Sequence, residues 1–339
     1  VLAFGMTYKE LFLSGTKKLT IGQAVNHALA DELASDESVL LQGEDIGALG
    51  GVYRVTEGLA ARFGSDRVVD APLGESGIVG TSIGLAQAGF RPVAEIQFDG
   101  FVHPAFDQIT SQLAKMHSRF RGAQQFPVTI RIPYGGGIGS VEHHSESPEV
   151  YFAHTAGLKV VTYSNAHDAY WVTRAAIQSA DPVILFEPKK HYFVRGEVDF
   201  DTPVTDPFAT VEARPGTDAT LLAWGPQVAT ALAAAEAGVE DGYDLQVLDI
   251  RGLSPLDMTA IADAVKSTGR AVIVHEASTF AGFGAEVSAG LMEHAFLSLE
   301  APVQRVGGYH MPYPPSRLEE DYLPSVDRIL DAVDETFTY

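Results

Sequence analysis

DAPLGESGIVGTSIGLAQAG, residues 70–89, is the stretch around which the rest of the chain is organised. It places one carboxylate, Glu75, where an apolar strand end turns into a helix. Small residues then follow at helical spacing on one face: Gly77, Gly80, Gly84 and Ala88. A glycine inside a helix costs about 1 kcal/mol relative to alanine, so this pattern favours close approach of another backbone. We therefore expect the helix start to be crowded and poor in water, where Glu75 needs a partner that hydrogen-bonds to it.

Strands and helices alternate on both sides of this stretch. Thr20 is placed to cap a helix, and a helix with an apolar stripe is expected to begin at Pro104. Buried strands are expected at 38–41, 67–69, 92–97, 127–132, 158–163 and 183–186. Further helices are expected near 57–63, 149–154 and 167–180. This alternation is typical of a parallel sheet with helices on both faces.

The chain is long enough for two domains. Its 339 residues exceed the size at which a single core usually stops growing. Periodicity lapses between 188 and 216, where prolines accumulate, and a second α/β series follows with strands near 220–224, 245–250, 271–275 and 303–306. We therefore expect an N-terminal extension at 1–19, a first domain at 20–190, a linker at 191–216 and a second domain at 217–339.

Composition excludes several classes of partner and site. With 44 acidic and 23 basic residues the net charge is −21, which argues against nucleic-acid and membrane partners. The chain has no cysteine, so thiol nucleophiles and thiolate metal sites are absent. No apolar run approaches the roughly 20 residues that span a bilayer, and we expect a cytoplasmic protein.

Polar residues follow the ends of several predicted strands. Glu44, Glu75 and Gln97 do so, and a glycine-rich loop at 135–139 leads to His143 and His144. Because ligands of parallel α/β sheets bind outside the carboxyl ends of the strands, we expect these residues to converge on one crevice. For Glu75 alone, the simpler alternative is a carboxylate stabilised by the helix dipole.

Other candidate motifs in the sequence do not match the spacing of known metal-binding, nucleotide-binding or hydrolase sites. His143 and His144 are adjacent in an extended loop and lack a metal-binding spacing, so we expect one site histidine, one surface histidine and no metal site. The glycine loop lacks the Lys-Ser/Thr ending of a P-loop. Gly74-Glu75-Ser76-Gly77 lacks the spacing of a nucleophile elbow, and His275-Glu276 lacks that of a zinc protease.

The ordered motifs of the chain resemble one family, the E1 beta subunits of thiamine-diphosphate-dependent 2-oxo acid dehydrogenases, and within it the branched-chain type. They are DAPLGESGIVG at 70–80, EIQF at 95–98, HSESPE at 144–149, GLKVV at 157–161 and FEPK at 186–189. The second half contributes AWG at 223–225, VLDIR at 247–251, HEA at 275–277 and LEAP at 299–302. The resemblance extends from Thr20 to the end of the chain.

The resemblance implies a transketolase-like pyrimidine-binding domain followed by a transketolase C-terminal-like α/β domain. It also implies that Glu75 hydrogen-bonds N1′ of the thiamine diphosphate pyrimidine and so promotes activation of the cofactor. His144 would lie near the reacting centre, where it orients substrate or passes a proton to lipoamide. The remaining cofactor-binding residues it implies are Glu44, Leu73, Gln97 and Phe101, the last at a position where branched-chain members more often have tyrosine.

Half of the cofactor site is missing from the sequence. Thiamine-diphosphate enzymes hold Mg²⁺ and the diphosphate with a Gly-Asp-Gly motif, and this chain has none. The resemblance therefore implies an E1 alpha subunit that holds Mg²⁺ in an α2β2 heterotetramer, a lipoyl-bearing E2 acyltransferase as the acyl acceptor, and possible structural K⁺ near Val128, Thr129 and residues 176–181.

The sequence leaves alternatives open. A pyruvate or acetoin dehydrogenase E1 beta subunit is the nearest. A split transketolase-like half, which would transfer its product to an aldehyde, and a non-catalytic scaffold that docks E2 are more distant. The glycine face at 77–88 is a candidate subunit contact, and its alternative is close packing inside this chain.

Overall fold

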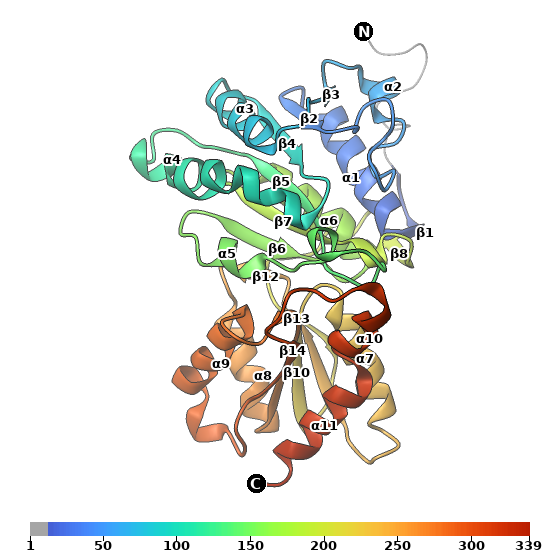
Figure 1. The fold of residues 1–339 in the computed structure, drawn as a ribbon, viewed down its shortest axis with the longest axis vertical. Helices are drawn as coiled ribbons and strands as arrows, with labels where there is room; N and C mark the ends of the chain where they lie inside the picture. The colour runs from blue at the N-terminus through green and yellow to red at the C-terminus, as the bar shows by residue number, and fades with distance from the viewer. Residues whose placement is uncertain (1–12) are drawn as a thin grey trace.

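The computed structural model describes residues 13–339 and shows two α/β domains, one above the other in Figure 1. Each is a sheet covered by helices. Most of the predicted N-terminal extension, residues 1–12, lies outside the described residues. No helix in the described part of the chain is long and apolar enough to cross a membrane.

The first domain is built on a seven-stranded sheet in the order β12-β6-β7-β5-β4-β2-β3. Six of its strands run parallel, and the edge strand β12 is antiparallel. The parallel strands are β2 (Val39–Gly43), β3 (Val68–Asp70), β4 (Arg91–Glu95), β5 (Thr129–Tyr134), β6 (Lys159–Thr162) and β7 (Val183–Pro188). The predicted parallel sheet is therefore confirmed.

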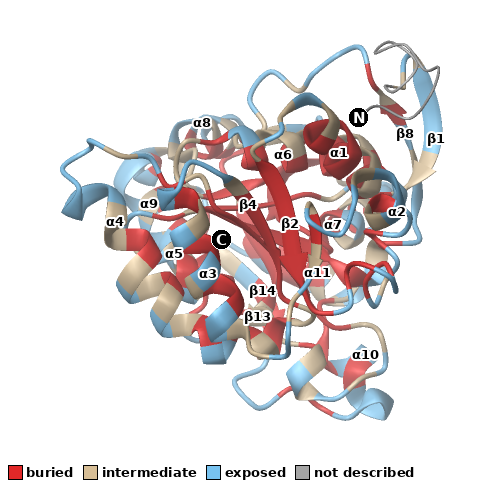
Figure 2. Ribbon diagram, turned by 90° about the horizontal axis from the view of Figure 1, so that it is seen from above, coloured by how far each residue is buried: buried red, intermediate tan, exposed pale blue. Residues whose placement is uncertain are grey.

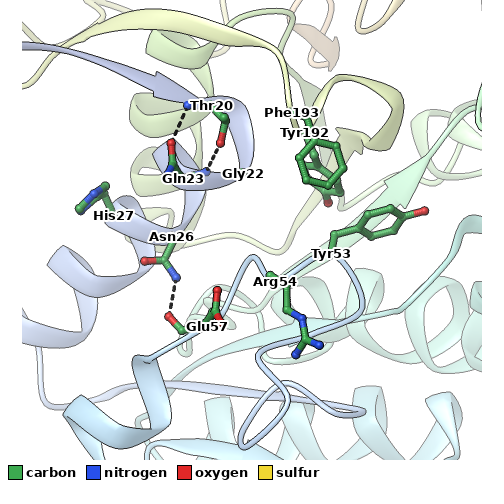
Figure 3. Close-up of a pocket in the computed structure, with 10 residues that line it drawn as sticks. All are labelled: Thr20, Gly22, Gln23, Asn26, His27, Tyr53, Arg54, Glu57, Tyr192 and Phe193. Atoms are coloured by element: carbon green, nitrogen blue, oxygen red, sulfur yellow. Dashed lines mark hydrogen bonds between the residues drawn. The ribbon is translucent and has the colours of Figure 1, made fainter.

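Helices cover both faces of this sheet. Helices α1 (Ile21–Ser35) and α6 (Ala166–Gln178) pack together on one face. The other face carries α3 (Glu75–Gln87), α4 (Ala114–Arg119) and α5 (Glu149–Ala153), and α2 (Leu59–Phe63) lies beside β3. The start of α1 is fixed by a reciprocal cap in which Thr20 and Gln23 each accept the other's backbone N–H (Figure 3).

The strands of the first sheet are apolar on both sides, as parallel strands between two helix layers must be. In β7, Val183 and Leu185 face the core under α1 and α6, whereas Ile184 and Phe186 face the opposite core. Figure 2 shows β2 and β4 buried at the centre, while α3 carries exposed segments. The sheet thus forms a rigid base for the loops at its carboxyl edge.

The second domain has a five-stranded sheet in the order β14-β13-β10-β11-β9, in which only β9 is antiparallel. Its strands are β9 (Val211–Arg214), β10 (Ala219–Ala223), β11 (Leu245–Asp249), β13 (Ala271–Ser278) and β14 (Gln304–Gly308). Helices α7 (Gln227–Ala237) and α11 (Val326–Thr336) cover one face, and α8 (Met258–Thr268) and α9 (Phe283–His294) cover the other. A short helix, α10 (Glu319–Tyr322), precedes α11.

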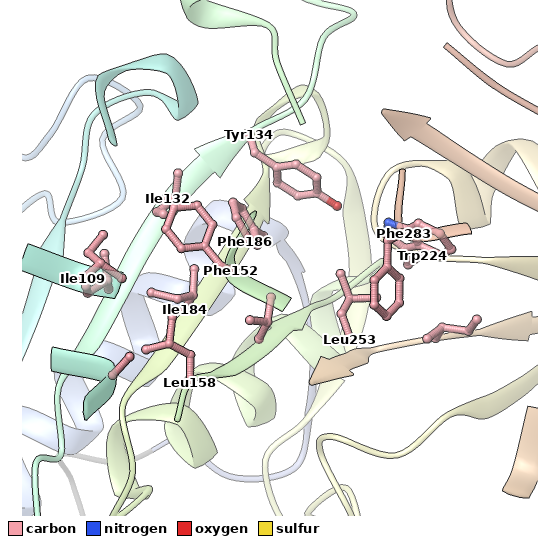
Figure 4. Close-up of a cluster of buried hydrophobic side chains, with 14 of the residues drawn as sticks. Ile109, Ile132, Tyr134, Phe152, Leu158, Ile184, Phe186, Trp224, Leu253 and Phe283 are labelled. Atoms are coloured by element: carbon pink, nitrogen blue, oxygen red, sulfur yellow. The ribbon is translucent and has the colours of Figure 1, made fainter. Parts of the chain in front are cut away.

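The two domains share one hydrophobic core. Strand β12 (Gly252–Ser254) follows β11 of the second sheet but pairs with β6 of the first. Trp224 stacks on His275 at 5.0 Å and donates its indole N–H to Glu149 of the first domain at 3.3 Å. Figure 4 shows the apolar side chains that continue from one sheet to the other. The joint therefore fixes the second domain against the first.

Two segments differ from the sequence prediction. The helix expected to begin at Pro104 instead begins as a 3₁₀ turn at Asp99–Ala105, continues as a π-helical turn at Gln108–Leu113 and becomes α-helical only in α4. The predicted linker, 191–216, contains β8 (Arg195–Asp199), which pairs with β1 (Thr16–Thr20), and β9 of the second sheet. These pairings join segments far apart in sequence, which local periodicity does not report.

The buried Glu149 side chain makes the domain joint sensitive to pH. Burial raises the pKa of Glu149 from its ordinary 4.5 to about 8, so the folded protein keeps this carboxyl protonated at neutral pH. The unfolded chain releases the proton from about pH 4.5 upward, so this group's contribution to stability falls by about 1.4 kcal/mol per pH unit up to about pH 8. We expect Glu149→Gln to remove this loss. Urea unfolding of both proteins from pH 5 to 8 tests it, and parallel stability profiles would contradict it.

Candidate active site

The carboxyl ends of the parallel strands bring the predicted site residues to one edge of the first sheet. Glu44 follows β2, Asp70 ends β3 and Gln97 follows β4. The loop that carries His144 follows β5. These residues therefore share one edge of the sheet, but Glu44, Gln97 and His144 do not line the cavity at Glu75, whereas Phe101 and His143 do.

Glu75 is the first residue of α3 and opens onto a cavity. Its carboxylate is partly exposed and makes no hydrogen bond to any residue between 13 and 339. The cavity measures about 410 Å³ and is lined by Glu75, Gly100, Phe101, His103, Pro104, His143 and Glu146. A carboxylate at this place is available to a ligand.

Glu44 and Gln97 form hydrogen bonds that hold the turn before Glu75. Glu44 is buried and accepts the backbone N–H of Gly74 at 3.2 Å. Burial raises the pKa of the Glu44 carboxyl, and the neighbouring Glu75 adds to the rise. The Gln97 amide donates to the Glu44 carbonyl oxygen at 3.4 Å. These contacts fix the start of α3 against β2 and β4.

His144 is held between two aromatic rings. Its ring centroid lies 4.4 Å from that of Phe98 and 5.2 Å from that of Phe101, both in edge contact. Burial lowers the pKa of His144, and the Lys189 ammonium lowers it further. The imidazole is therefore neutral at pH 7, and its Nδ1 is buried without a hydrogen-bond partner in the described chain. A neutral histidine in this state can take or give a proton.

A buried ion pair that the sequence did not reveal fixes the loop behind His144. Asp99 and Lys189 pair with both side chains fully buried. The second Asp99 oxygen accepts the backbone N–H of Glu146 at 2.5 Å. Burial raises the pKa of Asp99 and lowers that of Lys189, and their mutual attraction opposes both shifts. Both residues follow strand ends, which is the one sequence signal that could have paired them.

Gly100 allows the loop to approach the site closely. A Cβ at this position would lie 2.6 Å from the His143 carbonyl oxygen, so only glycine fits. The cavity wall also includes His103 and Glu146, which the sequence did not place in the site. His143, expected as the surface histidine, is exposed and also lines the cavity.

The glycine pattern predicts a crowded helix start, and this prediction is wrong for the described chain. A Cβ at Gly77 or Gly84 would meet nothing within 4 Å, and at Gly80 it would meet only Gln108 at 3.6 Å. Leu73, expected to line the cofactor pocket, is 86% exposed. Close packing of this face against residues 13–339 is therefore excluded, and no described residue covers it.

The described part of the chain shows no side-chain cluster for a cation. Residues 13–339 contain no group of three or more histidine, aspartate and glutamate side chains placed to hold a metal ion. In the turn after α6, the Lys159 ammonium lies 3.2 Å from both Ser179 Oγ and an Asp181 carboxylate oxygen. A K⁺ ion at this turn would therefore depend on backbone carbonyl groups.

A second cavity lies at the start of α1, apart from the predicted site residues. It measures about 390 Å³, and Tyr53, Arg54, Tyr192 and Phe193 line one side of it (Figure 3). Tyr53 also contacts Phe98 at 5.8 Å between ring centroids, so it connects this cavity to the rings around His144.

Comparison with known proteins identifies both domains. Family models match residues 17–194 as "Transketolase, pyrimidine binding domain" and residues 209–329 as "Transketolase, C-terminal domain". A pyruvate dehydrogenase E1 component subunit beta from Leifsonia xyli is 54% identical over 95% of this chain and 96% of its own. A 3-methyl-2-oxobutanoate dehydrogenase subunit beta from Mycobacterium tuberculosis is 51% identical over 94% of this chain and 92% of its own.

A solved structure shows the same fold. It is described as a split gene transketolase in an inactive beta4 tetramer, with a TM-score of 0.79 over 94% of this chain and 98% of its own. Its sequence is 21% identical, so this likeness concerns the fold alone.

The Asp99–Lys189 pair provides a stability test of the site. Asp99→Ala leaves a buried ammonium without a partner, for which we expect a loss of about 3–5 kcal/mol. Lys189→Met in the same chain removes that charge, so the double variant should be more stable than Asp99→Ala alone. Urea unfolding of the single and double variants measures the coupling, and strictly additive losses would contradict it.

Proposed function

The chain belongs to the E1 beta subunits of thiamine-diphosphate-dependent 2-oxo acid dehydrogenases, and we propose that it acts on branched-chain 2-oxo acids within a site that a second chain completes. The observation that carries this proposal is the Glu75 carboxylate, which opens onto a cavity without a hydrogen-bond partner in the described chain. His143 and Glu146, from the loop that carries His144, line the same cavity.

The residues around Glu75 fit the pyrimidine end of thiamine diphosphate. This cofactor supplies, when bound, the carbon nucleophile and electron sink that decarboxylation of a 2-oxo acid requires. Glu75 would accept a hydrogen bond from the protonated N1′ of the pyrimidine and so hold a proton there. Phe101 offers an apolar ring beside the same cavity, and Glu44 and Gln97 keep the helix start in place. A charge-assisted hydrogen bond in a site closed to water is among the strongest available to a carboxylate.

His144 is suited to the transfer of a proton later in the reaction. Its neutral imidazole carries one ring nitrogen that can accept a proton and one that can donate. The contacts with Phe98 and Phe101 limit how far the ring can turn. We assign His144 the delivery of a proton to the sulfur of the lipoyl group on E2, which becomes a thiol when the acyl group is transferred.

The open surface beside Glu75 supports an alpha subunit as the partner. The chain lacks the Gly-Asp-Gly motif for Mg²⁺ and diphosphate, so another chain must hold them. Leu73 is an exposed apolar side chain two residues before Glu75, and the glycine face of α3 is unoccupied. We propose that the alpha subunit covers both in an α2β2 heterotetramer. Structural K⁺ and a cytoplasmic location stay predictions from the sequence.

Two substrates are supported by different observations. The motifs QF at 97–98, HPAFDQ at 103–108 and SESPE at 145–149 favour a branched-chain 2-oxo acid, and one relative is a 3-methyl-2-oxobutanoate dehydrogenase subunit. The relative at 54% identity is a pyruvate dehydrogenase subunit, so pyruvate is the second candidate. A single methylene changes the discrimination between two substrates by only about 1–3 kcal/mol. Residues that the alpha subunit contributes to the pocket therefore also affect which acid is preferred.

Glu75→Gln tests the catalytic role. The amide cannot hold the proton at the pyrimidine nitrogen, so we expect the assembled enzyme to lose about 100- to 10,000-fold in decarboxylation rate while the subunits still assemble. Asp327→Asn is a matched control, because Asp327 also lies in the first turn of a helix but far from the cavity. Wild-type activity of Glu75→Gln would support the scaffold alternative.

Substrate choice is tested on the assembled enzyme. With the alpha subunit, thiamine diphosphate and Mg²⁺ present, we expect kcat/KM to be higher for 3-methyl-2-oxobutanoate and 4-methyl-2-oxopentanoate than for pyruvate. The measurement is the rate of decarboxylation across the three acids. A clear preference for pyruvate would replace the branched-chain assignment with the second candidate.

A further inference from the structure

The glycine-rich loop that leads to His144 is held by a carboxylate from the other domain. Glu319, in α10, is buried and accepts two backbone N–H groups with its two oxygens. Gly137 donates to Oε1 at 2.7 Å, and Gly139 donates to Oε2 at 3.0 Å. One carboxylate thus binds the loop at two positions, and the bonds are charge-assisted.

Neighbouring side chains complete the site that holds this loop, which consists of Glu319, Glu276 and Tyr313 and is called the seat below. Glu276, at the end of β13, accepts the N–H of Gly136. The Tyr313 hydroxyl donates to Glu319 at 2.6 Å and lies 3.2 Å from the Gly137 nitrogen. A Cβ at Gly136 would overlap Tyr313, so the loop backbone is fitted closely to the second domain. Three glycines of this flexible segment, Gly136, Gly137 and Gly139, are therefore held by side chains of the second domain.

The seat lies within the loop that carries the site histidine. The loop is closed at its base, where the Gly135 N–H donates to the Glu146 carbonyl oxygen at 2.9 Å. Asp99 fixes the returning end through the Glu146 N–H. Glu319 fixes the outgoing half at Gly139, five residues before His144. The path of the backbone up to His144 thus depends on both contacts.

We propose that Glu319 is a positioning residue for His144. It does not line the cavity that Glu75 opens onto, and it acts by fixing the backbone that presents the imidazole. The inference rests on the proposed function, because it assigns Glu319 to the step that His144 serves. It gives the second domain a part in the reaction through a defined contact with the first.

Loss of this contact has a specific chemical consequence. In Glu319→Gln one oxygen remains to accept an N–H, but the amide nitrogen presents its own hydrogens to the other glycine N–H. The loop then samples further conformations, and His144 spends less time at the reacting atoms. Misplacement of a catalytic group by about 1 Å can cost 100-fold in rate. The turn before Glu75 is held separately, by the bond from the Gly74 N–H to Glu44.

The experiment uses the assembled enzyme with both subunits, thiamine diphosphate and Mg²⁺. Two rates are measured per assembled site: decarboxylation with an artificial electron acceptor, and acylation of a lipoyl domain. The ratio of the two rates is compared among wild type, Glu319→Gln, His144→Ala and the control Glu320→Gln, which alters an exposed neighbour with no hydrogen bond in the described chain. Hydrogen exchange at Gly137 and Gly139 is followed in the same samples.

We expect Glu319→Gln to shift the ratio in the direction of His144→Ala, with acylation slowed about 10- to 100-fold, and to speed amide exchange at both glycines. A ratio equal to that of wild type would overturn the proposal, whatever the change in overall activity, because a merely structural role lowers both rates together.

Two further variants separate the possible causes of failure. If Glu319→Gln does not assemble, Tyr313→Phe decides, since it removes one hydrogen bond from Glu319 and should shift the ratio in the same direction by less; an unchanged ratio overturns the proposal. If Glu75→Gln is inactive while Glu319→Gln keeps the wild-type ratio, only the positioning role fails. If Glu75→Gln is fully active, the proposed function itself fails.

Discussion

The carboxylate of Glu75 has no hydrogen-bond partner in the described chain, and the rest of the site depends on that fact. A charged group that faces a cavity gains a strong interaction only from a ligand that can hydrogen-bond to it. The sheet supplies the rigid edge from which α3 starts, and Glu44 holds the preceding turn by the Gly74 N–H. Membership of the E1 beta family names the ligand, and the open surface beside Leu73 is where we propose that the second chain binds.

The local parts of this fold follow from the sequence. Thr20 and Gln23 form the cap expected at α1, and the apolar runs become parallel strands whose ends carry Glu44 and Gln97. The prediction that failed concerns the surroundings of the glycine face of α3. Glycines at helical spacing do predict close approach, but the approaching backbone belongs to no described residue of this chain, so Glu75 is partly exposed here. A pattern in one chain cannot say which molecule it serves.

Long-range contacts were beyond sequence reasoning. The Asp99–Lys189 pair joins residues 90 positions apart, and Glu319 reaches Gly137 across 182 positions. The position of Asp99 and Lys189 after strand ends does not identify them as partners, and Glu319 has no such signal, because each contact depends on how two distant segments meet. The glycine loop illustrates the result: its composition indicates mobility, yet carboxylates of the second domain bind three of its backbone N–H groups. The shared core around Trp224 keeps those carboxylates in register with the loop.

The central claim is that this chain supplies one half of a cofactor site, and calorimetric titration of thiamine diphosphate with Mg²⁺ tests it most directly. The titration is made into the chain alone, into its alpha subunit alone and into the two assembled. The account predicts measurable binding heat with tight affinity only for the assembly. Tight binding to this chain alone would contradict it.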